Sequence, residues 1–179
     1  ANFWFVFDVT HSWMVGTETL LIALLEEPDW VRDMFDTYLN ASIACFDAIW
    51  DAGYHFDEIF WCDDMGYKGT PFFSNAIYRE LLQPYHRRAV EWAHNHGIYA
   101  HLHSCGDIMP LIPDVLATGV DCLNPLEVKA GMDAADAVLS SGLPGRAAVG
   151  DGMEVQIGLD VGQAGRSGHG QERIVPFPG

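Results

Sequence analysis

The chain has 179 residues, nearly half of them apolar, which is enough for one domain with a sizeable core. With 25 acidic and 9 basic residues, the formal net charge is −16. So acidic a surface repels phosphate backbones and anionic lipids, which argues against nucleic-acid and membrane partners. The four cysteines are widely spaced and form no CxxC pair, so we expect a reduced, cytoplasmic protein rather than a disulfide scaffold.

Apolar strand-like runs alternate with amphipathic helix-like segments along the chain. The predicted strands are 3–7, 58–62, 98–103, 120–123 and 147–149. The predicted helices are 17–25, 28–50, 75–82, 85–95, 109–118 and 133–140. Short connections between such elements favour parallel strand pairing with right-handed crossovers.

The expected fold class is therefore α/β, either a (β/α)8 TIM-barrel type or an open doubly wound sheet. A closed barrel needs about 250 residues, so about five parallel strands predict an incomplete barrel. We expect this partial barrel domain to span 1–150 and a Gly-rich tail, flexible or altered in sequence, to span 151–179. The sequence has no GxGxxG and no GxxxxGK[ST] motif, so nothing favours nucleotide binding.

The segment His101-Leu102-His103-Ser104-Cys105-Gly106-Asp107 ends the third predicted strand. Because side chains alternate along a strand, His101, His103 and Cys105 share one face. Imidazole and thiolate groups there suit zinc or another borderline-soft metal ion. His101 is the weaker candidate ligand, and the alternative is an inert buried thiol beside hydrogen-bonded histidines.

Three carboxylates are candidates for the same edge, where α/β folds bind ligands. Asp63 and Asp64 follow the strand 58–62, and Glu127 follows 120–123. Each aspartate has three open roles: metal ligand, proton acceptor, or a carboxylate that orients a histidine. The alternative is that the aspartate pair caps its loop and that Glu127 is an ordinary surface carboxylate.

Several motifs, in this order and spacing, resemble the uroporphyrinogen decarboxylase superfamily over roughly residues 10 to 140. They are Asp63-Asp64-Met65-Gly66, Phe72-Phe73-Ser74, Leu82-Gln83-Pro84-Tyr85, His101 to Asp107, Gly119 to Leu126, and Ala130-Gly131-Met132-Asp133. The superfamily includes decarboxylases of haem (porphyrin) biosynthesis and cobalamin-dependent methyltransferases. The resemblance implies a TIM barrel with its site at the carboxyl ends of the strands. Family members are longer, so we expect a partial chain.

The pair His103-x-Cys105 resembles the zinc-ligand pattern of the methyltransferase branch. There zinc activates a thiol toward a methyl group carried on cobalamin, so the resemblance implies zinc, a small-molecule substrate and methyl-cobalamin on a corrinoid partner protein. In that branch the third ligand is a later cysteine, whereas no cysteine follows Cys122 here. Zinc-assisted methyl transfer or demethylation is therefore the first functional hypothesis.

Two alternatives remain open. A decarboxylase acting on a tetrapyrrole with eight carboxylates needs several converging arginines, and none of the seven arginines lies at a predicted strand end near His103. A catalytically incomplete half-barrel would have a structural or binding role. Its two exposed sheet edges favour self-association, so we expect a homo-oligomer.

Overall fold

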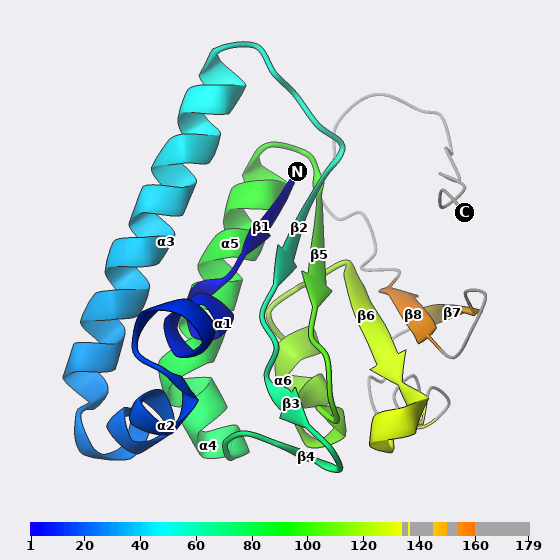
Figure 1. Ribbon diagram of the computed structural model, residues 1–179. Coiled ribbons are helices and arrows are strands. Elements are labelled where there is room, and N and C mark those ends of the chain that lie inside the picture. Colours follow the sequence, from blue (N-terminus) through cyan, green and yellow to red (C-terminus); the bar gives the residue numbers. More distant parts are fainter. Residues whose placement is uncertain (134–135, 137–144, 150–153, 160–179) are drawn as a thin grey trace.

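A computed structural model describes residues 1–133, 136, 145–149 and 154–159, and for the last two segments it describes the backbone alone. Its centre is a sheet whose strands follow the order β1-β2-β5-β6-β8-β7 (Figure 1). The bounds of these strands are Asn2–Trp4, Glu58–Cys62, Tyr99–His103, Cys122–Glu127, Glu154–Leu159 and Gly145–Val149. The four strands β1, β2, β5 and β6 are parallel, which confirms the α/β class and its likeness to part of a TIM barrel.

The fifth predicted strand exists but is not parallel. β7 pairs antiparallel with β8, and β8 pairs antiparallel with β6. Only four residues separate β7 from β8, whereas a parallel crossover needs a dozen or more residues, so the short connection accounts for the hairpin. The described sheet is therefore open, with four parallel strands rather than about five.

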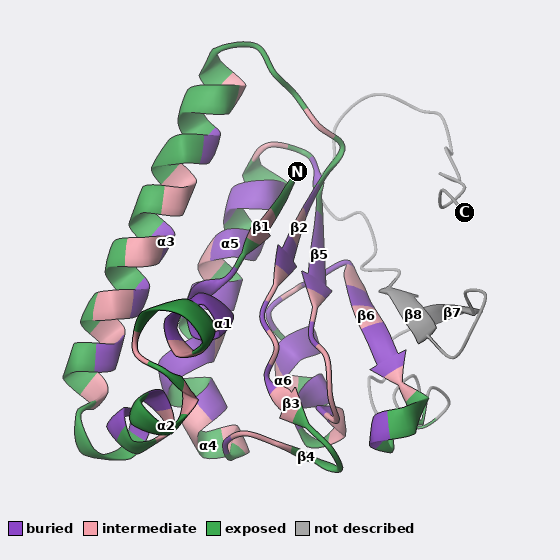
Figure 2. Ribbon diagram, in the orientation of Figure 1, coloured by how far each residue is buried: buried purple, intermediate pink, exposed green. Residues whose placement is uncertain are grey.

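Helices cover one face of this sheet. The α-helices are α1 (Val6–Val9), α2 (Thr17–Glu26), α3 (Pro28–Asp51), α4 (Asn75–Ile77), α5 (Gln83–Asn95) and α6 (Ile112–Leu116). π-helical turns span Thr10–Met14 and Tyr78–Leu82, and 3-10 turns span Met109–Leu111 and Val128–Ala130. Figures 1 and 2 show α3 and α5 running beside the strands, with their buried residues turned inward.

The long helix α3 follows from its sequence. Pro28 suits the first turn of a helix, and the buried Val31, Phe35 and Leu39 recur every four residues along one stripe. From the sheet, alternate residues such as Trp61 and Leu102 meet the helices and are fully buried or nearly so. The opposite face carries Phe60 and His101, which are register partners on neighbouring strands.

The predicted strand 3–7 is wrong at its carboxyl end. β1 stops at Trp4, and Val6 already begins α1. A short apolar run does not by itself distinguish strand from helix. Here the Thr10 hydroxyl donates to the Val6 carbonyl at 2.6 Å, one helical turn back.

A small hairpin lies near the carboxyl ends of the parallel strands. It consists of β3 (Gly66–Tyr67) and β4 (Thr70–Pro71), joined antiparallel. The predicted helix 133–140 lies almost wholly outside the described residues. Of the predicted tail, 154–159 form β8, and 151–153 and 160–179 lie outside the described residues.

Candidate metal centre at the carboxyl edge of the sheet

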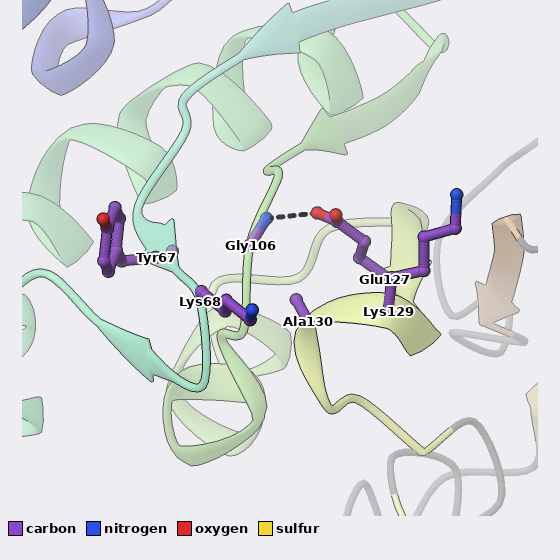
Figure 3. A pocket seen from close by; sticks show the side chains of 7 residues that line it. Tyr67, Lys68, Gly106, Glu127, Lys129 and Ala130 are labelled. Atoms are coloured by element: carbon purple, nitrogen blue, oxygen red, sulfur yellow. Dashed lines mark hydrogen bonds between the residues drawn. The ribbon is translucent and has the colours of Figure 1, made fainter.

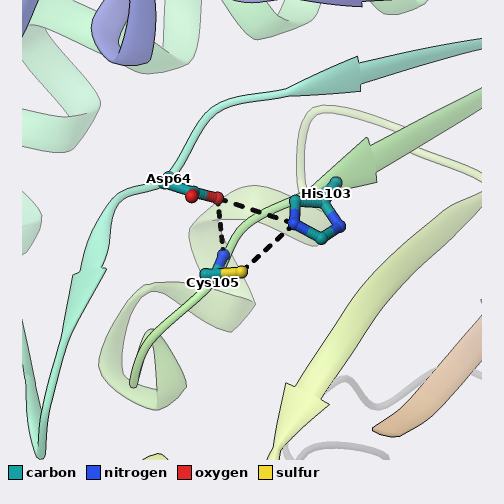
Figure 4. A group of neighbouring side chains, drawn as sticks. All are labelled: Asp64, His103 and Cys105. Atoms are coloured by element: carbon teal, nitrogen blue, oxygen red, sulfur yellow. Dashed lines mark hydrogen bonds and ion pairs between the residues drawn. The ribbon is translucent and has the colours of Figure 1, made fainter. Parts of the chain in front are cut away.

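Three potential metal ligands meet where β2 and β5 end. Asp64 follows β2, His103 is the last residue of β5, and Cys105 lies two residues further on. The His103 Nε2 atom lies 3.2 Å from the Cys105 sulfur and 3.7 Å from the Asp64 Oδ1 atom. Figure 4 shows the three side chains facing one another, and one donor atom from each lies within 4.8 Å of the others.

The donor set fits zinc. Tetrahedral zinc with ordinary bond lengths places its nitrogen and oxygen donors about 3.3 Å apart and its nitrogen and sulfur donors about 3.6 Å apart. The measured separations of 3.7 and 3.2 Å lie within half an ångström of these values. One imidazole, one thiolate and one carboxylate leave a fourth tetrahedral position for water or substrate, as catalytic zinc sites do.

Hydrogen bonds from two backbone amides join the loops that carry the ligands. The Cys105 amide donates to the Asp64 carboxylate at 2.8 Å, and the Gly66 amide donates to the Cys105 carbonyl at 3.1 Å. A Cβ added to Gly106, whose φ is +81°, would lie 2.3 Å from the backbone carbon of Gly66. Two glycines are therefore required for this close approach, which fixes the spacing of Asp64 and Cys105.

Burial is the main influence on the Asp64 carboxyl, and it raises the pKa of this group. The hydrogen bond from Cys105 and the nearby His103 act in the opposite direction. A cation bound between these side chains would stabilise the carboxylate form in the same way.

His101 does not join the group. It lies two residues before His103 on the same face, about 6.6 Å back along the strand. Its ring is buried, its Nδ1 atom lies 3.7 Å from the Glu58 carboxylate, and neither ring nitrogen has a hydrogen bond within 3.5 Å. Burial lowers the pKa of His101, although the Glu58 charge opposes this.

Asp63 is fully buried and points to the helical side of the sheet. Its carboxylate contacts His86 Nε2 at 2.8 Å and accepts the Asp8 amide at 2.8 Å. The Nδ1 atom of His86 lies 2.9 Å from the Tyr78 hydroxyl. The four residues of this hydrogen-bonded series are each at most 4% exposed. Asp63 therefore connects α1, α5 and the end of β2.

Glu127 lies at the same edge of the sheet but contacts a different loop. Its Oε2 atom accepts the Gly106 amide at 2.7 Å. Together with Gly106 it lines a pocket of about 440 Å³ (Figure 3). Asp107 accepts the Met109 amide at 2.9 Å, which is the capping role that its position before a helix predicts.

A second polar cluster was not predicted from the sequence. Asp8 is 4% exposed, and its Oδ1 atom lies 3.2 Å from His11 Nε2 and accepts the Ser12 hydroxyl at 2.9 Å. Its Oδ2 atom is buried and has no hydrogen bond within 3.5 Å. Asp8 is the first polar residue after the apolar run 3–7. A search for polar residues directly after each predicted strand would have found it.

The fold and this site define a class: α/β proteins built like part of a (β/α) barrel, with polar and potential metal-binding residues at the carboxyl ends of parallel strands. The family model "Uroporphyrinogen decarboxylase (URO-D)" matches residues 9–154. The chain belongs to this family.

Comparison with solved structures adds support for the fold. A methyltransferase from Methanosarcina mazei matches with a TM-score of 0.61 and 21% sequence identity. The match covers 79% of this chain and 39% of that protein, so the chain spans well under half of its length. A comparison with curated proteins gave no match. Among the described residues, no helix is long and apolar enough to cross a membrane.

Proposed function

We propose that this chain carries the metal centre of a zinc-assisted methyltransferase of the corrinoid type. The observation that carries the proposal is the convergence of Asp64, His103 and Cys105 on one point at the carboxyl edge of the sheet. The likeness in fold to a methyltransferase is consistent with it. Zinc held there would lower the pKa of a substrate thiol, which as a thiolate accepts a methyl group from cobalamin on a corrinoid partner protein.

The residues of the chain have distinct tasks in this proposal. His103 and Cys105 supply the nitrogen and sulfur donors, and Asp64 supplies the third donor in place of a later cysteine. The Cys105 amide, by donating to Asp64, orients this carboxylate before metal arrives. Glu127 holds the loop next to Cys105 through the Gly106 amide.

Decarboxylation of a tetrapyrrole carboxylate is the second candidate, because the matching family model is described as a uroporphyrinogen decarboxylase. Three of the four arginines within residues 1–133 do not favour it. Arg32, Arg79 and Arg88 lie on helices and pair with acidic side chains there. The proposed location is the cytoplasm, since none of the four cysteines forms a disulfide. Self-association through the open sheet is also proposed.

Metal analysis tests the proposal directly. The purified chain and the variants Asp64→Ala, His103→Ala and Cys105→Ser are incubated with zinc, desalted and measured by mass spectrometry. We expect near-stoichiometric zinc that all three substitutions remove. Cys45→Ser, which changes an exposed thiol on α3, is the matched control and should keep its zinc.

The same measurement assigns His101. Because this ring lies outside the group of three donors, His101→Gln should retain zinc in whatever fraction of the chain remains folded. Absence of zinc in the unaltered chain would reject the proposal. It would leave the decarboxylase and a non-catalytic half-barrel with a binding role as the remaining readings. Zinc lost equally from the Cys45→Ser control would show non-specific binding.

A further inference from the structure

The pocket beside the metal centre contains both lysines of the chain. Lys68 lies in the turn between β3 and β4, and Lys129 lies in the 3-10 turn after β6. Figure 3 shows them on opposite sides of the pocket, with Glu127 directed at the Gly106 amide between them. The sequence has no other lysine, so both of its lysines line one hollow of about 440 Å³.

Neither ammonium group has a hydrogen bond or ion pair with any described residue of the chain. The chain has 25 acidic and 9 basic residues, and three of the four arginines within residues 1–133 do contact a carboxylate. Arg32, Arg79 and Arg88 each contact a carboxylate at 2.6 to 2.8 Å. The two lysines lie among the same excess of carboxylates and remain available to a ligand.

Glu127 does not neutralise the pocket. Its Oε2 atom already accepts the Gly106 amide at 2.7 Å, and the residues that line the pocket include two lysines and one carboxylate, a formal charge of +1. A locally positive hollow on a chain of net charge −16 attracts small anions selectively, because the rest of the surface repels them. Both lysine side chains are exposed, and their flexible stems let the ammonium groups turn toward an anion.

Two backbone links join the pocket to the metal centre. Gly106 lines the pocket and follows Cys105 in the chain, while Gly66 lines the pocket and donates to the Cys105 carbonyl. We propose that this pocket binds the oxyanion group of the small-molecule substrate, a carboxylate, sulfonate or phosphate held by Lys68 and Lys129. The inference rests on the proposed function in one respect: it assigns the pocket to the substrate of that metal centre.

Anion binding is measured on the zinc-free chain in EDTA, so that it does not depend on metal. Inorganic phosphate, methanesulfonate and acetate are titrated separately at constant ionic strength, and the amide NMR signals of Gly66 and Gly106 are followed. We expect saturable shifts of both signals with at least one anion. The anion that binds most tightly identifies the oxyanion chemistry.

The variants Lys68→Gln and Lys129→Gln should each weaken this binding about five- to tenfold, since each removes one charged donor. Glu127→Gln, which removes the opposing charge, should tighten it. Arg88→Gln is the matched control, because it makes the same charge change on α5. Circular dichroism confirms that each variant is folded.

Shifts that are unaffected by both lysine substitutions, or reduced equally by Arg88→Gln, would overturn the inference. So would the absence of saturable shifts with all three anions. A chain that binds an anion but no zinc would contradict the proposed function alone. A chain that binds zinc but no anion would contradict this inference alone.

Discussion

Asp63 and Asp64 are adjacent in sequence, yet the structure gives them opposite tasks. Asp63 is fully buried and accepts bonds from His86 and from the Asp8 amide. The Asp64 side chain is one-third exposed and faces His103. We therefore predict that replacing Asp63 lowers stability, whereas replacing Asp64 removes the metal and leaves stability nearly unchanged.

The magnitudes follow from the contacts. Asp63→Ala removes one member of a buried ion pair or charged hydrogen bond and leaves the His86 nitrogen and the Asp8 amide without an acceptor. Breaking such a buried pair costs about 3–5 kcal/mol, a large part of the roughly 5–15 kcal/mol that stabilises a domain. Asp64→Ala removes one bond from the Cys105 amide at a partly exposed position, which costs about 1 kcal/mol.

Urea unfolding in the absence of metal, followed by circular dichroism, measures the free energy of unfolding for the chain and both variants. Zinc content is then measured on each variant under conditions where it is folded. The expected result is a strongly lowered midpoint for Asp63→Ala and a nearly unchanged midpoint with no zinc for Asp64→Ala. Equal destabilisation by the two changes, or zinc retained by Asp64→Ala, would refute the reasoning.

Two further predictions concern the glycine contact and the thiols. Gly106→Ala should lower both the unfolding midpoint and zinc affinity, because its Cβ would meet backbone at 2.3 Å. Gly53→Ala, with φ +87° and open space around it, should cost only about 1 kcal/mol and keep zinc. Burial raises the pKa of Cys62 to about 11 and that of Cys122 to about 12. At pH 8 a thiol reagent should therefore label the exposed Cys45 much faster than either of them.

These thiols also give stability a pH dependence. Because their pKa values are higher in the folded chain than the ordinary value of 9.0, folding favours the protonated form. The contribution is fully present below pH 9 and is lost as the pH rises through about 11 and 12. Thermal unfolding between pH 8 and pH 12 checks this, and a melting temperature that rises over this range would contradict it.

The sequence predicts most of the fold because apolar periodicity marks the strands and helices directly. β2 spans Glu58–Cys62 as expected, and α3 extends the predicted helix by a single residue. The β7–β8 hairpin is less predictable, because strand direction depends on connections and partners rather than on the pattern of one segment. The end of β1 is ambiguous because all residues from Phe5 to Phe7 are buried.

The candidate site is predictable in part. The strand pattern places His103 and Cys105 on one face, and the structure brings them to 3.2 Å. The same pattern puts His101 on that face but about 6.6 Å behind His103, so sharing a face does not by itself bring a side chain to the other donors. Asp64 comes from another strand, and only the register Cys62↔His103 brings it to these residues. The lysine pocket depends on turns after β3 and β6, which have no periodic signal.

The alternation of side chains along β2 continues through Asp63 and Asp64, and it explains why these two aspartates point to opposite faces of the sheet. Ile59 and Trp61 point to the helices and are buried, and Asp63 continues this series at 0% exposure. Phe60 and Cys62 lie on the other face, and Asp64 continues their series toward His103. Where two acidic residues follow a parallel strand, the one that falls on the same face as the core residues is the supporting carboxylate. The other one falls on the opposite face and faces the site. After β5 the same alternation puts Ser104 on the buried face and Cys105 on the face of the site. Alternation thus places the candidate donors of both strands.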